Sequence, residues 1–195
     1  MSNTNKHQHF ILHKPYGYLS QLINNQKRRK NKKLLGELYN FPKGTMAIGR
    51  LDQSSEGLLL LTTDGKVSEY IRSQKVEKEY YVQVDGEIDD NAIEKLQKGV
   101  EIGIEGKKYL TKPCKASHVA SIDHLPIAYR KVRDDRHGSK SWIAIVITEG
   151  KFRQVRKMTA AVGFPTLRLV RVRVGDIALN IEVGEVKEHP NFMIT

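Results

Sequence analysis

The segment Gly49–Gly65 carries the residues best suited to chemistry, because an arginine and an aspartate flank a single leucine in Arg50-Leu51-Asp52, ahead of an apolar run. An aspartate at the mouth of a buried strand is a candidate nucleophile, and a neighbouring guanidinium favours its ionised form. The same two residues could instead form a structural ion pair that caps a turn. For an isolated Arg-x-Asp spacing, the structural interpretation is the more common one.

The overall charge indicates what kind of partner such a site would meet. The 195 residues include 33 Lys and Arg against 22 Asp and Glu, which gives a formal net charge of +11. This excess indicates a polyanionic partner, either nucleic acid or an anionic membrane surface. Residues 27–33 form a basic run, which is expected to be an exposed loop because its like charges repel. This loop is either a solvated patch or a phosphate clamp. Its basic residues are Lys27, Arg28, Arg29, Lys30, Lys32 and Lys33.

Several classes of protein and site are excluded or disfavoured by features that the sequence lacks. The single cysteine, Cys114, excludes an intramolecular disulfide framework and a cysteine-cluster zinc site. The seven histidines have no metal-ligand spacing, and no phosphate-loop, dinucleotide or serine-hydrolase motif occurs. The longest apolar stretch, Gly57–Leu61, is far shorter than the roughly 20 residues of a membrane span, and the polar N-terminus resembles no signal peptide. We therefore expect a cytoplasmic protein without a metal site.

The elements that must position the candidate residues follow from apolar periodicity. Alternation or dense Ile and Val predicts strands over residues 9–13, 80–85, 141–148 and 167–174. A helix is expected to start at Asn91, whose spacing from Glu94 resembles a capping box, and to end near Gly99. A second helix is expected over 152–162, before Gly163.

Mixed strands and helices without regular alternation favour an α+β fold over a doubly wound sheet. We expect a disordered tail over residues 1–8, followed by one continuous domain over 9–195. Subdomains at 9–60 and 61–195 are conceivable, but no Pro-, Ser- or Gly-rich linker separates them.

Four segments, in this order, resemble the motifs of the RsuA-type pseudouridine synthases. They are Leu12–Gly17 (LHKPYG), Gly49–Gly65 (GRLDQSSEGLLLLTTDG), Lys78–Val82 (KEYYV), and Glu149–Met158 (EGKFRQVRKM) with Leu167–Val172 (LRLVRV). Two positions depart from the usual pattern, because His13 stands where Asn is commoner and Phe152 where Asn or another polar residue is frequent. The matches extend from about Ile11 to Ile177, which is most of the chain.

The resemblance implies the catalytic fold of that family, a mostly antiparallel mixed sheet with flanking helices and a central cleft. Many relatives carry an N-terminal RNA-binding module of the S4 type, which we do not expect here because the opening motif begins so early. This departure resembles the RluE branch, whose substrate is large-subunit ribosomal RNA. The implied partner is therefore ribosomal RNA, above all 23S, and we expect a monomer with no membrane and no obligate protein partner. The basic run at 27–33 would then take over part of the missing module's electrostatic role.

The resemblance also implies roles for individual residues. Asp52 would be the catalytic aspartate, Arg156 its ion-pair partner, and Tyr80 the residue that stacks on the target base. Arg50 would fill the space left by the flipped base or grip its phosphate. Positive charge for the RNA backbone would come from Arg153, Arg168, Arg171 and Arg173. The implied isomerisation of uridine to pseudouridine involves no redox change and no net consumption of water, so no cofactor is expected.

Other interpretations remain open at this stage. A non-catalytic RNA-binding or ribosome-assembly protein on the same scaffold would keep the basic patches but could lose Asp52 or Arg156, and both are present. Glu56 with Asp52 suggests a two-carboxylate glycosidase, which nothing else in the sequence supports. A membrane-surface protein would need a basic amphipathic helix, and none is evident. Cys114 is not expected to be a nucleophile, because no partner for it can be identified.

Overall fold

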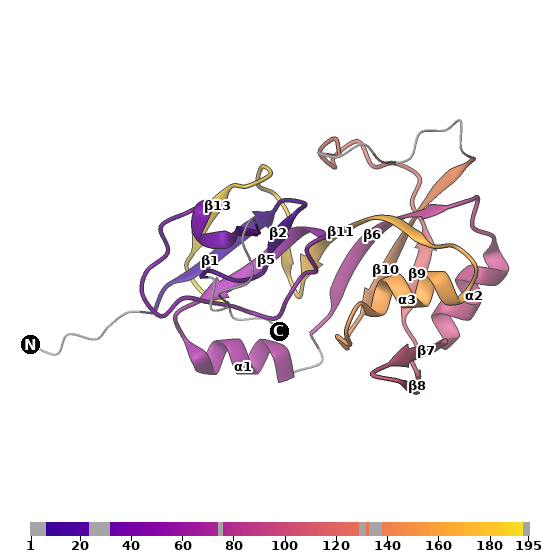
Figure 1. The fold of residues 1–195 in the computed structure, drawn as a ribbon, viewed down its shortest axis with the longest axis horizontal. Coiled ribbons are helices and arrows are strands. Elements are labelled where there is room, and N and C mark those ends of the chain that lie inside the picture. Colours follow the sequence, from indigo (N-terminus) through magenta and orange to yellow (C-terminus); the bar gives the residue numbers. More distant parts are fainter. Residues whose placement is uncertain (1–6, 24–31, 74–75, 129–131, 133–137, 193–195) are drawn as a thin grey trace, which may run out of the picture.

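A computed structural model describes residues 7–23, 32–73, 76–128, 132 and 138–192 of the chain (Figure 1). Within these residues, nine strands form one sheet that runs through the elongated molecule. In spatial order they are β13 (Val186–His189), β1 (His9–Lys14), β5 (Glu56–Thr62), β11 (Thr166–Val174), β6 (Lys78–Asp85), β10 (Lys140–Ile147) and β9 (Lys115–His118), with β12 (Ile177–Ala178) on β11 and β4 (Met46–Ala47) on β5.

The middle of the sheet is a narrow junction between two halves. All pairings in this sheet are antiparallel except β5 with β11, which are parallel and share only two residue pairs, Val170 with Glu56 and Arg171 with Gly57. Gly57 has φ +103°, and a Cβ at this position would lie 2.3 Å from the Arg171 carbonyl oxygen. A glycine is therefore required for the two strands to approach.

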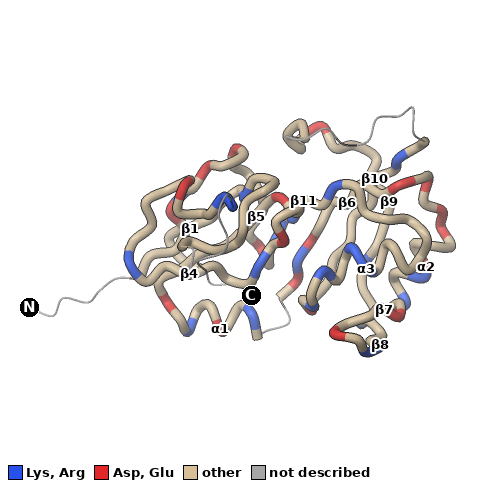
Figure 2. The backbone as a smooth tube through the Cα atoms, in the orientation of Figure 1, with Lys and Arg blue, Asp and Glu red and all other residues tan. Residues whose placement is uncertain are grey.

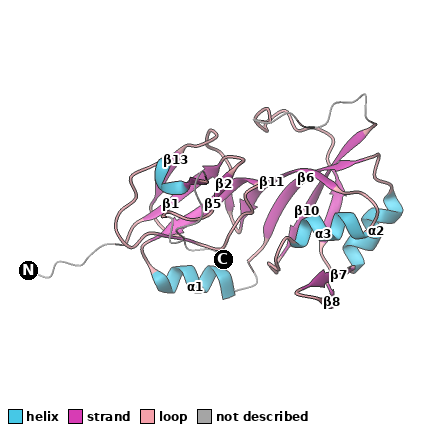
Figure 3. Cartoon of the chain, viewed as in Figure 1, coloured by secondary structure: helices cyan, strands magenta, loops and turns pink. Residues whose placement is uncertain are grey.

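Helices and two small ladders complete the halves (Figure 3). The helix α1 (Gly65–Ser73) lies beside the half that contains β1 and β5, whereas α2 (Asp90–Lys98) and α3 (Gln154–Ala161) lie against the half that contains β6 and β10. Away from the sheet, β2 (Tyr18–Leu19) pairs with β3 (Lys33–Leu34), next to the 3-10 turn η1 (Leu35–Glu37), and β7 (Glu101–Ile104) pairs with β8 (Lys107–Leu110).

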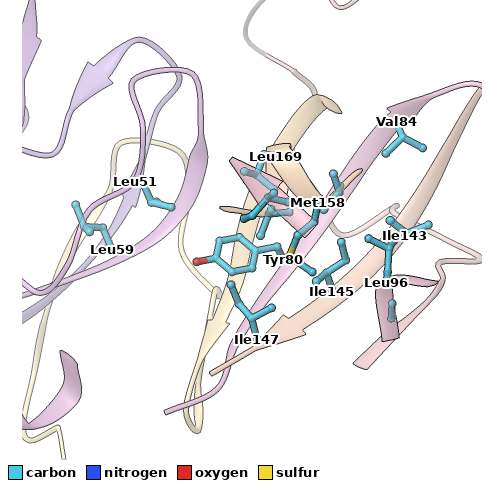
Figure 4. Close-up of a cluster of buried hydrophobic side chains, with 14 of the residues drawn as sticks. Leu51, Leu59, Tyr80, Val84, Leu96, Ile143, Ile145, Ile147, Met158 and Leu169 are labelled. Atoms are coloured by element: carbon cyan, nitrogen blue, oxygen red, sulfur yellow. The ribbon is translucent and has the colours of Figure 1, made fainter. Parts of the chain in front are cut away.

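The apolar core continues across the junction (Figure 4). One buried cluster includes Leu51 and Leu59 from one half together with Ile145 and Met158 from the other. The alternation expected for residues 80–85 is confirmed, because Tyr80 and its alternate neighbours on β6 are buried while the intervening residues are half-buried. Shared apolar packing fixes the position of one half against the other.

The four expected strands and two expected helices are present, but both helix starts were predicted wrongly. The side chain of Asp89, and not Asn91, caps α2, since its Oδ1 accepts a hydrogen bond of 2.7 Å from the Ala92 amide. The second helix starts at Gln154 rather than residue 152, because Arg153 adopts a left-handed conformation with φ +53°. A helix cannot pass through a residue in that region.

The structure also bears on the expected domain limits. Residues 1–6 of the predicted tail lie outside the described residues. The Thr63 amide donates to the Gln8 carbonyl, and the Gln8 amide donates to Oγ1 of Thr63, so the chain is already anchored there. The conceivable boundary between residues 60 and 61 falls inside β5. Among the described helices, none is both long and apolar enough to cross a membrane.

Candidate active site

A cavity of about 480 Å³ lies at the junction of the two halves and contains the predicted aspartate. Its walls come from the loop before β5, the end of α1, the start of β6, the turn before α3, and β11. The residues used below are Arg50, Asp52, Arg72, Lys78, Tyr80, Lys112, Lys151, Arg153 and Arg171. The volume is in the range of small-ligand pockets and would accommodate a single nucleotide base.

Backbone hydrogen bonds fix the loop that carries Asp52. The hydroxyl of the buried Ser20 donates to the Leu51 carbonyl at 2.8 Å and accepts from the Leu51 amide at 3.0 Å. The Gly17 amide donates to the Gln53 carbonyl, and the Ser55 amide closes the turn by donating to the Asp52 carbonyl. The aspartate therefore stands on a preorganised turn, which is what a catalytic side chain requires. Sequence inspection gave no signal for Ser20.

Two arginines from the α3 segment face the Asp52 carboxylate. One oxygen, Oδ2, lies 3.7 Å from Nη1 of Arg153 and 4.0 Å from Nε of Arg156. The Arg156 guanidinium also donates to the Ser54 carbonyl at 2.8 Å, so it holds both the aspartate and its turn. The Asp52 side chain is 24% exposed, which leaves it accessible from the cavity. Arg156, the predicted partner of Asp52, therefore lies at the outer limit of ion-pair distance from its carboxylate.

A buried lysine supports the same turn from the opposite side. Lys14, at the end of β1, is fully buried and its ammonium donates to the carbonyls of Ser55 at 2.7 Å and Pro15 at 3.0 Å. Burial lowers its pKa to about 7, although Glu56 and Asp52 oppose this effect by attracting the charge. The carbonyls of residues 54 and 55 are thus held by cations from two different segments.

Tyr80 projects from β6 across the junction. Its ring packs in the shared core, and its hydroxyl end is directed toward the half that carries Leu51 and Leu59 (Figure 4). The residue is buried but lines the cavity with Asp52. An aromatic face in the wall of a cavity suits the stacking of a base.

Exposed cations surround the cavity mouth. Arg50 is exposed and lines the cavity, as does Arg153. The structure adds Arg72 and Lys112, which are ordinary surface cations outside the motifs, and Lys151, which lies within the last motif but was not singled out there. In the tube view, Lys and Arg positions follow β6, β11 and α3 through the middle of the molecule (Figure 2). The mouth of the cavity is therefore positively charged.

Residues 8–161 match the family described as RNA pseudouridylate synthase. The chain belongs to this family. It is 44% identical over 183 residues to ribosomal large subunit pseudouridine synthase E of Vibrio parahaemolyticus, a match that covers 91% of this chain and 72% of that protein. The synthase E of Xanthomonas axonopodis pv. citri is 39% identical over 175 residues, covering 87% of each.

A solved structure supports the same assignment. A crystal structure of a pseudouridylate synthase superposes with a TM-score of 0.73 at 28% identity, covering 94% of this chain and 70% of that one. The expected α+β pseudouridine synthase fold, with its mostly antiparallel sheet, is confirmed.

In this synthase fold, the arginines of β11 do not all have the positions expected of phosphate ligands. Arg168 is buried, pairs with Glu56 at 2.8 Å and donates to the Pro126 carbonyl. Arg171 is buried and donates to the Leu58 carbonyl at 2.7 Å, although it also lines the cavity. Arg173 is bound by Glu77 and Glu79. The expectation that these three side chains contact the RNA backbone is corrected, because internal acceptors already engage them.

The remaining sequence predictions concern the basic run, the cysteine and the metal site. Residues 27–30 of the run lie outside the described residues; Lys32 and Lys33 are exposed beside β2. Burial raises the pKa of Cys114 to about 11, and its thiol lies against the Leu96 carbonyl, so it is a poor nucleophile. In the described part of the chain, no three His, Cys, Asp or Glu residues gather as metal ligands.

Proposed function

We propose that this chain isomerises a specific uridine to pseudouridine in the RNA of the large ribosomal subunit. The observation that carries the proposal is the Asp52 carboxylate, held on a fixed turn between Arg153 and Arg156 and open to a cavity that Tyr80 lines. The relatives named as large-subunit synthases, at 44% and 39% identity, support the choice of RNA.

The reaction breaks the bond between uracil N1 and ribose C1′, turns the base, and joins C5 to C1′. Asp52 would act on the ribose or the base, and the two guanidinium groups beside it would orient its carboxylate. A target uridine must leave its stack to enter the cavity, which costs a few kcal/mol. The Tyr80 ring would replace part of the lost stacking.

The cations at the cavity mouth have a separate role in this proposal. Arg50, Arg72, Lys112, Lys151 and Arg153 would hold phosphates around the flipped nucleotide. Arg50 is also positioned to occupy the space that the base leaves. These contacts would orient the RNA without reading its sequence, so the choice of uridine would depend on additional contacts.

The test is tritium release from transcripts that contain 5-tritiated uridine, because C5 loses its hydrogen only when the new carbon–carbon bond forms. Transcripts of 23S and 16S rRNA are incubated with the wild type and with Asp52→Asn. Release from 23S RNA by the wild type alone is the expected result. Tight, salt-sensitive binding without release from either transcript would favour the non-catalytic RNA-binding alternative.

The same proposal includes the assembly state and the basic run. We expect residues 9–195 to act as one catalytic domain, as a monomer without an obligate protein partner, in the cytoplasm where ribosomal RNA is processed. Light scattering coupled to size exclusion measures the molar mass, for which 22.2 kDa is expected. Neutralising the six basic residues of 27–33 should weaken RNA binding and flatten its salt dependence; unchanged binding would remove this run from the RNA interface.

A further inference from the structure

Phe152 is a large, exposed apolar side chain on the turn before α3, between two residues that line the cavity. It is 66% exposed, and it belongs to neither buried apolar cluster of the described residues. Its neighbours in sequence, Lys151 and Arg153, both line the cavity, whereas Phe152 does not. The turn that carries Phe152 therefore borders the cavity, although its ring does not line it.

The turn that carries Phe152 is held rigidly. Arg153 has φ +53°, a conformation that a non-glycine residue adopts only when its surroundings impose it. The Lys151 amide donates to Oε1 of the buried Gln154 at 2.9 Å, and the Gln154 amide group donates in turn to Glu149. These bonds keep Phe152 directed out of the core.

A lysine from α3 covers part of the ring. Nζ of Lys157 lies 5.3 Å from the centroid of the Phe152 ring, a cation–π distance, and donates to the Gly103 carbonyl of β7 at 2.6 Å. Because β7 anchors the ammonium, the ring has one fixed cationic neighbour, and most of its remaining surface is open. This is a rigid aromatic platform flanked by positive charge.

We infer that Phe152 stacks on a base next to the target uridine, and this inference rests on the proposed RNA-modifying function. A base has an apolar π-face that matches the exposed ring, and its phosphates match Lys151, Arg153 and Lys157. The target uridine itself would occupy the cavity, which is lined by the residues on either side of Phe152 in the sequence. An apolar protein partner would complement the ring but not the three surrounding cations.

The platform predicts a distinctive pattern among three variants, Phe152→Ala, Phe152→Leu and Phe152→Trp. Loss of one stacked base should weaken binding by about 5- to 150-fold. Alanine and leucine should raise both Kd and KM for a 23S transcript by that factor with little change in kcat, whereas tryptophan should restore wild-type values. Ile127→Ala, which removes a side chain that is 94% exposed elsewhere, is the matched control and should change neither constant.

Fluorescence provides a readout that does not depend on catalysis. The wild type has one tryptophan, Trp142, so Phe152→Trp adds a single second indole. RNA should quench this variant more strongly than the wild type, because the added indole would stack on a base. Quenching without tritium release would overturn the proposed function but keep the platform. Release with no extra quenching, or leucine restoring binding as well as tryptophan does, would overturn the platform itself.

Discussion

Two carboxylate–arginine pairs lie four residues apart on the same segment, and they differ in nearly every physical respect. Glu56 starts β5 with a side chain that is 6% exposed, and Arg168 binds it through Nε and Nη2, the shortest contact being 2.8 Å. Asp52 stands on the preceding loop, is four times more exposed, and has its arginines at 3.7 and 4.0 Å. The first pair is closed, and the second leaves room beside the carboxylate.

The difference indicates that the closed pair has a structural role, whereas the open pair is available for chemistry. The Glu56–Arg168 pair joins β5 to β11 at the narrow junction of the sheet, where few ladder bonds exist. The Asp52 carboxylate instead exposes part of its surface to an open cavity. This exposure does not stabilise the fold, but it leaves the carboxylate accessible to a substrate. The closed geometry also removes Glu56 from the two-carboxylate glycosidase interpretation, because its oxygens face Arg168.

Breaking the open pair, in which Arg153 and Arg156 face Asp52, is expected to have the largest effect, a loss of activity. Asp52→Asn keeps the shape of the side chain but removes its charge, so activity measured by tritium release should fall by at least about 10⁴-fold. The free energy of unfolding in urea should change little, because the carboxylate is partly exposed and Arg156 also binds the Ser54 carbonyl. Residual activity above one per cent would mean that another group performs the chemistry.

Breaking the closed pair, Glu56 with Arg168, should instead lower the stability of the fold. Glu56→Gln leaves the Arg168 charge buried without compensation, which should lower the free energy of unfolding by about 3–5 kcal/mol. Replacing both partners by apolar residues, Glu56→Leu with Arg168→Met, should recover most of this loss. Glu101→Gln, at an exposed pair with Lys108, is the control and should leave the urea midpoint unchanged. A stable Glu56→Gln protein would contradict the structural assignment.

A milder change tests the geometry of the open pair. Arg156→Lys keeps the positive charge but cannot contact Asp52 and the Ser54 carbonyl together, so kcat should fall by about 10- to 100-fold. Arg173→Lys, whose guanidinium binds Glu77 and Glu79 away from Asp52, is the matched control and should retain kcat. An equal loss in both variants would mean that the effect comes from stability alone.

The smallest expected effect is a change of stability with pH that comes from Lys14, whose charge both Glu56 and Asp52 attract. Its pKa falls from 10.5 to about 7 on folding, so between these values the unfolded chain binds a proton that the folded chain lacks. The free energy of unfolding contributed by Lys14 should therefore rise with pH, by about 1 kcal/mol between pH 7.5 and 8.5. Urea unfolding of the wild type and Lys14→Met at these pH values measures it, and a constant difference would contradict it.

Above pH 9 a second group acts in the opposite direction. Burial raises the pKa of Cys114 from 9.0 to about 11, so the unfolded chain loses a proton there that the folded chain keeps, and stability falls as pH rises. The Lys14 comparison is therefore best made below pH 9.

Local sequence patterns predicted most of the helices and strands, whereas the family resemblance predicted the residues of the site. Alternation along 80–85 is a property of the strand itself, so it is visible without the fold. The family resemblance pointed to Asp52 and Tyr80, which line one cavity, and to Arg156, which lies beside Asp52 without lining the cavity. The helix starts were missed because Asp89 and Asn91 are both good caps, and because nothing in the sequence marks Arg153 as left-handed.

Long-range contacts account for the rest of what was missed. Whether an arginine of β11 faces RNA or an internal carboxylate depends on Glu56, 112 residues away from Arg168. Lys14 gave no sign of burial, since lysine is rarely buried. The cations of the cavity rim come from separate segments, and only the fold gathers them.

The separation in sequence between the two sides of the open pair has a consequence for biosynthesis. The Ser54 carbonyl and the Arg156 guanidinium that holds it are 102 residues apart. At about 5–20 residues per second, translation needs roughly 5–20 s to pass from one to the other. During that interval β1 and β5 can pair, but the aspartate lacks its cationic partners. The nascent chain thus acquires its complete site only after Arg156 has been synthesised.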